Sequence, residues 1–247
     1  MFVKLDLKYV FSSVLMIAWL IGCGRANSQP QPVAPVASSS VSPPPQPSEP
    51  AAPPRPTIVA FGDSLTAGLG VSRDESYPAE LQGELDARGY NYRVVNEGIS
   101  GNTSKDGVLR IQEVLKFHPS VVIVAFGGND GLRGLPIRDT EMNLSAIIAA
   151  MQDAHAKVIL GGITLPPNYG SNYIAKFNAI YVKESKAHRM PLLAFMLKGV
   201  YDVPGSMQDD GIHPTEQGCR QVARNFLPLL LPLLQKPVPN HATPHPH

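Results

Sequence analysis

Cysteine is scarce in this chain, with only Cys23 and Cys219 among 247 residues. Cys23 lies at the end of an apolar leader and Cys219 near the start of the last predicted helix, so no disulfide framework is expected. We expect Cys219 to pack in the interior as a small apolar side chain without a chemical role. Stability must then come from a hydrophobic core, and residues 57–235 are numerous enough to form one domain around such a core.

Blocks of one charge are also missing. The chain has 21 Lys and Arg against 20 Asp and Glu, a formal net charge of +1, and without residues 1–22 the net charge is zero. Proteins that bind nucleic acids carry a basic stripe or patch that neutralises phosphates, and none is visible here. Nucleic acid is therefore not an expected partner.

No apolar run is long enough to cross a bilayer comfortably. The longest one, residues 10–22, follows Lys4 and Lys8 and has the length of a signal-peptide core. It ends in Leu-Ile-Gly-Cys at positions 20–23, which resembles the bacterial lipobox, whose cysteine is acylated before the leader is removed. We expect residues 1–22 to be a lipoprotein signal peptide and Cys23 the lipid attachment site. The alternative is an ordinary signal peptide with an incidental cysteine.

The segments on either side of the domain have little to bury. Residues 23–56 are rich in Pro, Ser, Ala and Gln and predict an extended, disordered spacer between a lipid anchor and the domain. Residues 236–247 predict a disordered tail. We expect an exported protein anchored in the bacterial cell envelope. Because Gly24 stands where an aspartate tends to retain lipoproteins at the inner membrane, the outer membrane is favoured.

Within residues 57–235, short apolar runs alternate with amphipathic stretches. Strands are predicted at residues 57–61, 92–96, 121–126, 157–161 and 192–195. Helices are predicted at residues 77–88, 107–117, 138–155, 172–188 and 215–234, with Pro228 and Pro232 breaking or kinking the last. This alternation predicts an α/β fold with three layers, α/β/α, around a mostly parallel five-stranded sheet of the flavodoxin-like type. Right-handed crossovers would place the loops after the strands at one edge of the sheet, where such folds bind ligands.

Ser64 follows the first predicted strand directly and is the candidate nucleophile. The Gly-x-Ser-x-Gly elbow of α/β-hydrolases is absent, because Thr66 stands where the second glycine would be. A serine hydroxyl is scarcely ionised at neutral pH, so Ser64 needs a base.

The best base is in the segment that contains Asp210, Gly211 and His213. A turn at the glycine could direct both side chains to one site, where the carboxylate would orient the imidazole as it takes the serine proton. Three alternatives remain: Asp210 could cap the helix predicted to begin near Thr215, His213 could be a loop residue, or the two could bind a metal. No third or fourth ligand stands out, and no metal is expected.

Two further loops offer hydrogen-bond donors for an oxyanion. Gly101 can bring a backbone N–H close to a ligand because it has no side chain. Asn129 follows the most hydrophobic predicted strand and can present its amide. Each loop alone is more often only a turn.

Together these segments resemble the SGNH/GDSL hydrolase family. Its four sequence blocks occur in order as Gly62-Asp63-Ser64-Leu65, Gly101, Gly127-Gly128-Asn129-Asp130 and Asp210-Gly211-Ile212-His213-Pro214. The resemblance covers about residues 57–235. The residues around the blocks look most like the bacterial thioesterase/lysophospholipase and arylesterase branch.

The resemblance assigns roles to the residues of the blocks. It implies Ser64 as nucleophile, His213 as general base and Asp210 as its orienting acid, with an oxyanion hole from the Ser64 and Gly101 N–H groups and the Asn129 side chain. Asp63 is interpreted as structural. The resemblance also implies substrate contacts in a mobile loop at residues 131–136 and in a Leu-Pro segment. These substrate-contact residues are Leu132, Leu135, Pro136, Leu165 and Pro166.

The implied function is that of a serine esterase that works through an acyl-enzyme without a cofactor, as a monomer. Aryl esters, short and medium acyl esters and lysophospholipids are the implied substrates, and thioesters are a further option. A carbohydrate or peptidoglycan O-acetylesterase is the alternative among enzymes. A non-catalytic envelope binding lipoprotein is the alternative from another class.

Overall fold

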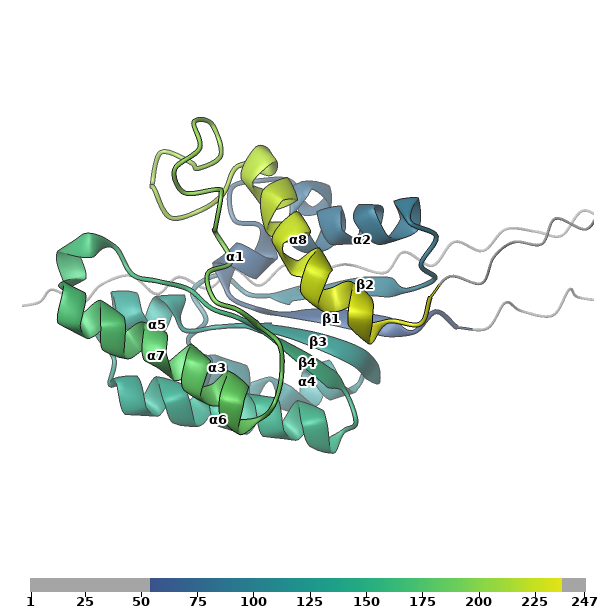
Figure 1. Ribbon diagram of the computed structural model, residues 1–247, viewed down its shortest axis with the longest axis horizontal. Helices are drawn as coiled ribbons and strands as arrows, with labels where there is room; N and C mark the ends of the chain where they lie inside the picture. Colours follow the sequence, from purple (N-terminus) through teal and green to yellow (C-terminus); the bar gives the residue numbers. More distant parts are fainter. Residues whose placement is uncertain (1–53, 237–247) are drawn as a thin grey trace, which may run out of the picture. The chain divides into compact units, whose positions relative to one another are not determined.

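The computed structural model describes residues 54–236, which form a five-stranded parallel sheet with helices on both faces (Figure 1). The strands lie in the order β2-β1-β3-β4-β5. Their bounds are Thr57–Gly62 for β1, Arg93–Gly98 for β2, Pro119–Ala125 for β3, Lys157–Gly161 for β4 and Leu192–Leu193 for β5. This is the predicted α/β fold. The leader, Cys23, most of the spacer and most of the tail lie outside the described residues.

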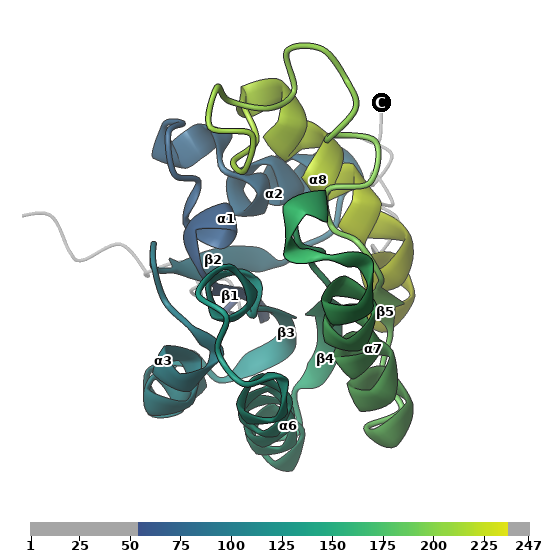
Figure 2. The ribbon, with the colours of Figure 1, turned by 90° about the vertical axis from the view of Figure 1, so that its left-hand side faces the viewer.

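Helices α2 (Tyr77–Ala87) and α8 (Glu216–Leu230) cover one face of the sheet. The opposite face carries α3 (Ser104–Leu109), α4 (Ile111–Leu115), α6 (Ile137–Asp153) and α7 (Ser171–Ala187), as Figure 2 shows for the labelled helices. Because side chains alternate along a strand, the buried strand β1 contributes to both cores. Ile58 and Ala60 pack in the first core, whereas Val59 and Phe61 pack in the second.

Short elements follow the strands at their carboxyl ends. Helix α1 (Ser64–Ala67) follows β1, and α5 (Gly128–Leu132) follows β3. Three short 3-10 helices complete the secondary structure of the described residues: η1 (Arg73–Glu75), η2 (Pro167–Tyr169) and η3 (Leu231–Leu233). No helix within residues 54–236 has the length and apolar character needed to span a bilayer.

Most predicted element ends lie within two residues of the observed ones. Three elements differ more clearly: one predicted helix is split, one strand is halved and the last helix is shortened. The helix predicted at 107–117 is two helices, because Arg110 leaves helical geometry and its guanidinium binds Glu97 and Asn102. The predicted strand 192–195 pairs only at Leu192–Leu193. The last helix continues through Pro228 but ends at Leu230, before Pro232. The helix thus passes the first proline and ends before the second, although each lacks the N–H that would bond to the carbonyl four residues earlier.

Candidate active site

Ser64 lies at the sharp junction between β1 and α1. Gly62 ends the strand, and a Cβ at this position would lie 2.2 Å from Thr66 Oγ1 and 2.6 Å from Ala125 O, so only glycine fits. Asp63 is the N-cap residue of α1, and its Oδ1 accepts a hydrogen bond of 3.1 Å from the Leu65 N–H. This cap begins the helix at Ser64 and fixes the serine at the carboxyl edge of the sheet.

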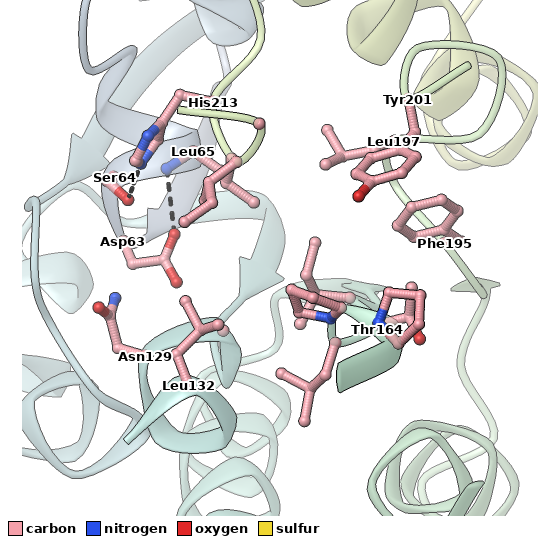
Figure 3. Close-up of a pocket in the computed structure, with 17 residues that line it drawn as sticks. Asp63, Ser64, Leu65, Asn129, Leu132, Thr164, Phe195, Leu197, Tyr201 and His213 are labelled. Atoms are coloured by element: carbon pink, nitrogen blue, oxygen red, sulfur yellow. Dashed lines mark hydrogen bonds between the residues drawn. The ribbon is translucent and has the colours of Figure 1, made fainter. Parts of the chain in front are cut away.

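Ser64, His213 and Asp210 form a chain of two hydrogen bonds, of which Figure 3 shows the one between Ser64 and His213. The distance from Ser64 Oγ to His213 Nε2 is 2.8 Å, and that from His213 Nδ1 to Asp210 Oδ2 is 2.6 Å. In the tautomer that fits this order, the Nδ1–H donates to the carboxylate and Nε2 accepts from the serine hydroxyl. This is the geometry of a Ser-His-Asp triad, in which the imidazole can take the serine proton.

The segment that carries His213 is fixed by its own turn and by one glutamine. Asp210 Oδ1 accepts hydrogen bonds from the backbone N–H groups of Ile212 and His213, at 2.9 and 3.0 Å. Gln208 donates through Nε2 to Leu69 O at 2.7 Å and to Pro214 O at 2.8 Å. Because Leu69 follows α1 closely, Gln208 links the segment of the base to the helix of the nucleophile.

These hydrogen bonds keep Asp210 ionised. The contact with the His213 side chain, followed by the backbone N–H of His213, lowers the pKa of Asp210 to about 2. The carboxylate therefore remains charged at any pH at which the protein works, and can stabilise a positive charge on the imidazole.

Helix α5 holds the loop of Gly101 through three side chains. Asn129 Nδ2 donates to Asn102 O at 2.9 Å, and Arg133 Nη2 donates to Gly101 O at 2.9 Å. The buried carboxylate of Asp130 accepts hydrogen bonds from the N–H and the hydroxyl of Ser104. Gly101 itself has a φ of +83°, which strains any other residue. The structure therefore brings the two predicted donor loops into direct contact with each other.

A cavity of about 380 Å³ opens beside Ser64 and His213. Of the predicted substrate-contact residues, Leu132, Leu165 and Pro166 line it, whereas Leu135 and Pro136 are exposed outside its lining. Asn129 lines the cavity too, while Gly101 does not. The other lining side chains are mostly apolar: Leu65, Ile163, Pro167, Phe195, Leu197, Tyr201 and Ile212, together with Asp63 and Thr164. The cavity has the composition of a site for a hydrocarbon chain.

Comparison with known proteins decides the family. The profile of the GDSL-like lipase/acylhydrolase family matches residues 60–221, which contain all four sequence blocks. The chain belongs to this family.

Characterised relatives of this GDSL-family chain are named as hydrolases of esters. It is 41% identical over 179 residues to Esterase TesA of Pseudomonas aeruginosa, a match that covers 72% of this chain and 89% of the relative. Thioesterase 1/protease 1/lysophospholipase L1 of Escherichia coli is likewise 41% identical over 179 residues, covering 72% of this chain and 85% of the relative. The crystal structure of TesA superposes with a TM-score of 0.70, covering 72% of this chain and 99% of that one. The GDSL-family chain is therefore an enzyme that hydrolyses esters.

Two stacked tyrosines hold the loop at residues 131–136, where the family resemblance predicts substrate contacts. Tyr169 donates its hydroxyl to Leu132 O at 2.8 Å, and Tyr173 donates to Leu135 O at 3.5 Å. The two rings stack with their centroids 6.5 Å apart. In this structure the loop at residues 131–136 is thus fixed to η2 and α7.

Asp63 is the buried carboxyl group of the site. Burial, partly offset by the Leu65 N–H and by His213, raises the pKa of Asp63 to about 7, and the negative charge of Asp130 adds to the rise. The folded GDSL-family enzyme therefore binds a proton on Asp63 over a pH range in which the unfolded chain has lost it. Stability contributed by this proton is present below about pH 4 and is lost as the pH rises to about 7.

Replacement of Asp63 by asparagine should remove this pH dependence, because the asparagine can still cap α1 but has no proton to lose. Between pH 4 and 8 we expect the wild type to lose free energy of unfolding on the order of 4 kcal/mol relative to the variant. Urea unfolding at pH 4 and pH 8 measures the difference. Asp139→Asn, an exposed acid in the first turn of α6, serves as the control and should follow the wild type. Equal pH dependence in Asp63→Asn and wild type would contradict the assignment.

The residues that form the cavity wall opposite Ser64 lie outside the four sequence blocks and were not predicted from them. Phe195 is the last residue of the strand predicted at 192–195, which pairs only at Leu192–Leu193, and Leu197 and Tyr201 lie in the segment that follows, where no element is predicted. Their apolar character was the only signal. Among residues 54–236, no three His, Cys, Asp or Glu side chains gather as metal ligands would.

Proposed function

We propose that this enzyme hydrolyses carboxylic acyl esters through an acyl-enzyme on Ser64, with His213 as general base and Asp210 as its orienting acid. The observation that carries the proposal is the chain of hydrogen bonds of 2.8 and 2.6 Å from Ser64 through His213 to Asp210, beside a largely apolar cavity. The hydroxyl, the base and a space for an acyl group lie within reach of one another.

In the first half of the reaction, Ser64 Oγ attacks the ester carbonyl carbon while its proton passes to His213 Nε2. The carbonyl π electrons move to the oxygen, which becomes an oxyanion. The Asp210 carboxylate accepts the hydrogen bond from His213 Nδ1–H and stabilises the imidazolium. As the carbonyl re-forms, the bond to the alcohol oxygen breaks and His213 returns the proton to that oxygen.

In the second half, water takes the place of the alcohol. The water oxygen attacks the acyl carbon, and His213 Nε2 accepts a proton from this water. The tetrahedral intermediate then breaks its bond to Ser64 Oγ, which recovers its proton from His213. The carboxylic acid leaves and the free serine is restored, so that no cofactor is consumed.

The oxyanion is proposed to lie among the N–H groups of Ser64 and Gly101 and the amide of Asn129. Figure 3 places the Asn129 amide on the side of the cavity where Ser64 and His213 lie. One Nδ2 hydrogen serves Asn102 O, which leaves the second for the oxyanion.

Asn129→Ala should therefore lower kcat by about 10²- to 10³-fold with a smaller change in KM, because the lost donor acts mainly on the transition state. Steady-state kinetics with p-nitrophenyl butyrate measure this split. Arg133→Ala is the matched control, since it removes a contact of the same helix with the same loop but no proposed oxyanion donor. If both variants lose the same factor, Asn129 only supports the loop.

The substrates are proposed to be aryl esters, short and medium acyl esters and lysophospholipids. The apolar cavity and the printed names of the relatives support this class. A panel of p-nitrophenyl esters from acetate to dodecanoate, a lysophospholipid, an acyl-CoA thioester and an acetylated glycan tests it. Cleavage of acetyl groups alone would favour the O-acetylesterase alternative and overturn this choice.

We also propose that Cys23 carries the lipid that anchors the enzyme in the cell envelope, with the outer membrane favoured. The leader and the lipobox-like residues 20–23 support this location. Metabolic labelling with palmitate should mark the wild type and not Cys23→Ser. Recovery of the wild-type enzyme in the inner-membrane fraction would contradict the outer-membrane assignment.

A further inference from the structure

Exposed apolar side chains are concentrated at the edge of the sheet that carries the active site. Nine large apolar side chains are exposed within residues 54–236. Three of them, Leu109, Met142 and Val182, lie on α3, α6 and α7. The other six lie on loops that follow the strands or the catalytic blocks. We call these six the apolar rim: Leu69, Ile99, Leu135, Tyr201, Val203 and Ile212.

Contacts of the rim residues place them around the entrance of the catalytic cavity. Tyr201 and Ile212 line the cavity itself, and Figure 3 shows Tyr201 across it from His213. Leu69 O accepts the hydrogen bond of Gln208, beside the segment of His213. Ile99 donates its N–H to Gly62 O, at the end of the strand that precedes Ser64. Tyr201 and Ile212 thus join the rim to the cavity, and Leu69 and Ile99 belong to loops that contact the elements of His213 and Ser64.

The cavity wall next to the rim is uncharged over a long stretch. Residues 162–175 contain no Asp, Glu, Lys or Arg and include the cavity residues Ile163, Leu165 and Pro166. The charges on the neighbouring loops have both signs, with Arg133 and Lys198 on one hand and Asp202 and Asp209 on the other. A partner of this surface would be held by apolar contact rather than by net charge.

The described chain enters β1 at the end of the sheet opposite to the active site. Arg93 donates its N–H to Pro56 O at the start of β1, which is the end of the strand opposite to Ser64. The residues between Cys23 and this point, if extended, could reach about 100 Å at about 3.1 Å per residue. A folded domain with as many residues as 54–236 has a radius of gyration of only about 16 Å. A chain anchored at Cys23 could therefore turn the apolar rim toward the membrane that holds it.

We propose that the apolar rim docks the enzyme on a lipid surface, from which the acyl chain of a membrane-embedded ester enters the cavity directly. This proposal rests on the acyl-ester hydrolase function proposed above and names the physical state of its substrate. A lipid surface fits better than a protein partner, because two rim residues, Tyr201 and Ile212, line the cavity that a hydrocarbon chain must enter.

The test compares three full-length proteins that share the same N-terminus. The rim variant carries Leu69→Gln and Val203→Gln, two exposed residues outside the cavity lining and the proposed catalytic groups. The control variant carries Leu109→Gln and Val182→Gln, which remove at least as much exposed apolar surface from α3 and α7. Each protein is assayed on monomeric p-nitrophenyl butyrate and on palmitoyl-lysophosphatidylcholine in phosphatidylcholine vesicles.

We expect the rim variant to lose about tenfold in rate on the vesicles while its rate on the monomeric ester stays unchanged. The control variant should match the wild type on both substrates. Equal vesicle rates for the rim and control variants would overturn the docking proposal and leave the proposed function standing. A wild type that cleaves neither substrate would overturn the proposed function itself. A wild type that is a dimer in sedimentation, with a monomeric rim variant, would assign the rim to self-association instead.

Discussion

Replacement of Ser64 by alanine should lower kcat for p-nitrophenyl butyrate by roughly 10⁴- to 10⁶-fold, because the acyl-enzyme cannot form without the hydroxyl. The residual rate would come from donors that still polarise a bound carbonyl. Folding should be nearly unaffected, since the Ser64 hydroxyl is hydrogen-bonded to the His213 ring, which can turn to water instead. Steady-state kinetics together with thermal unfolding check both statements.

The matched control for this experiment is Ser100→Ala, an exposed serine in the Gly101 loop. It should keep wild-type activity to within a few-fold. A fluorophosphonate probe should label the wild type and the Ser100 variant but not the Ser64 variant. Turnover retained by the pure Ser64→Ala enzyme would rule out the acyl-enzyme mechanism.

The second large effect is expected for His213→Gln. Glutamine has a similar size and can hydrogen-bond to Ser64, but it cannot accept the proton, so kcat should fall by roughly 10³- to 10⁵-fold. A twofold loss would identify another group as the base. The measurement is the burst and steady-state phase with p-nitrophenyl acetate, which reports acylation and turnover separately.

Asp210→Asn separates the orienting role from the basic one. The variant keeps an acceptor toward the His213 N–H groups but loses the charge that stabilises the imidazolium, and the loss in kcat should be smaller than that in His213→Gln.

The pKa of about 2 for Asp210 also implies that the free energy of unfolding depends on pH in the acid range. Because the carboxyl group ionises more readily in the folded protein, its stabilising contribution is present above about pH 4 and is lost as the pH falls to about 2. The side chain is 44% exposed, so this contribution to stability is small.

The layers of the fold follow from sequence because each strand is a short apolar run and each long helix is amphipathic. The sequence did not predict α1 and α5, since their four and five residues are too short to show periodicity. Capping by Asp63 sets the first of them. The break between α3 and α4 depends on two contacts of the Arg110 guanidinium. It binds Glu97 of the preceding strand β2, and it lies over the Phe61 ring, 5.2 Å from the ring centroid. Such tertiary contacts leave no periodic trace in the sequence.

The sequence identified the candidate catalytic residues more completely than the residues that form the walls of the cavity. Ser64, Gly101 and Asn129 follow three neighbouring parallel strands closely, so topology brings them to one edge. His213 lies in the long segment between β5 and α8 and was predicted from the motif around it. The segment with Phe195 and Tyr201 has no such constraint. Its path depends on distant hydrogen bonds, notably from Asn225 Nδ2 to Met196 O and Lys198 O at 3.1 and 2.7 Å.

The catalytic groups and one wall of the cavity lie on different parts of the chain, and this affects how the substrate preference of such an enzyme can change. The nucleophile and the α5 contacts to the Gly101 loop belong to elements at the ends of the central strands, whereas one wall of the cavity comes from residues 195–201, which precede the segment of Asp210 and His213. Exchange or lengthening of residues 195–201 would change the shape of the cavity wall that contacts the hydrocarbon chain, while Ser64, His213 and Asp210 keep their positions. New substrate preferences can therefore arise through changes in a single stretch of chain, without rebuilding the chemistry.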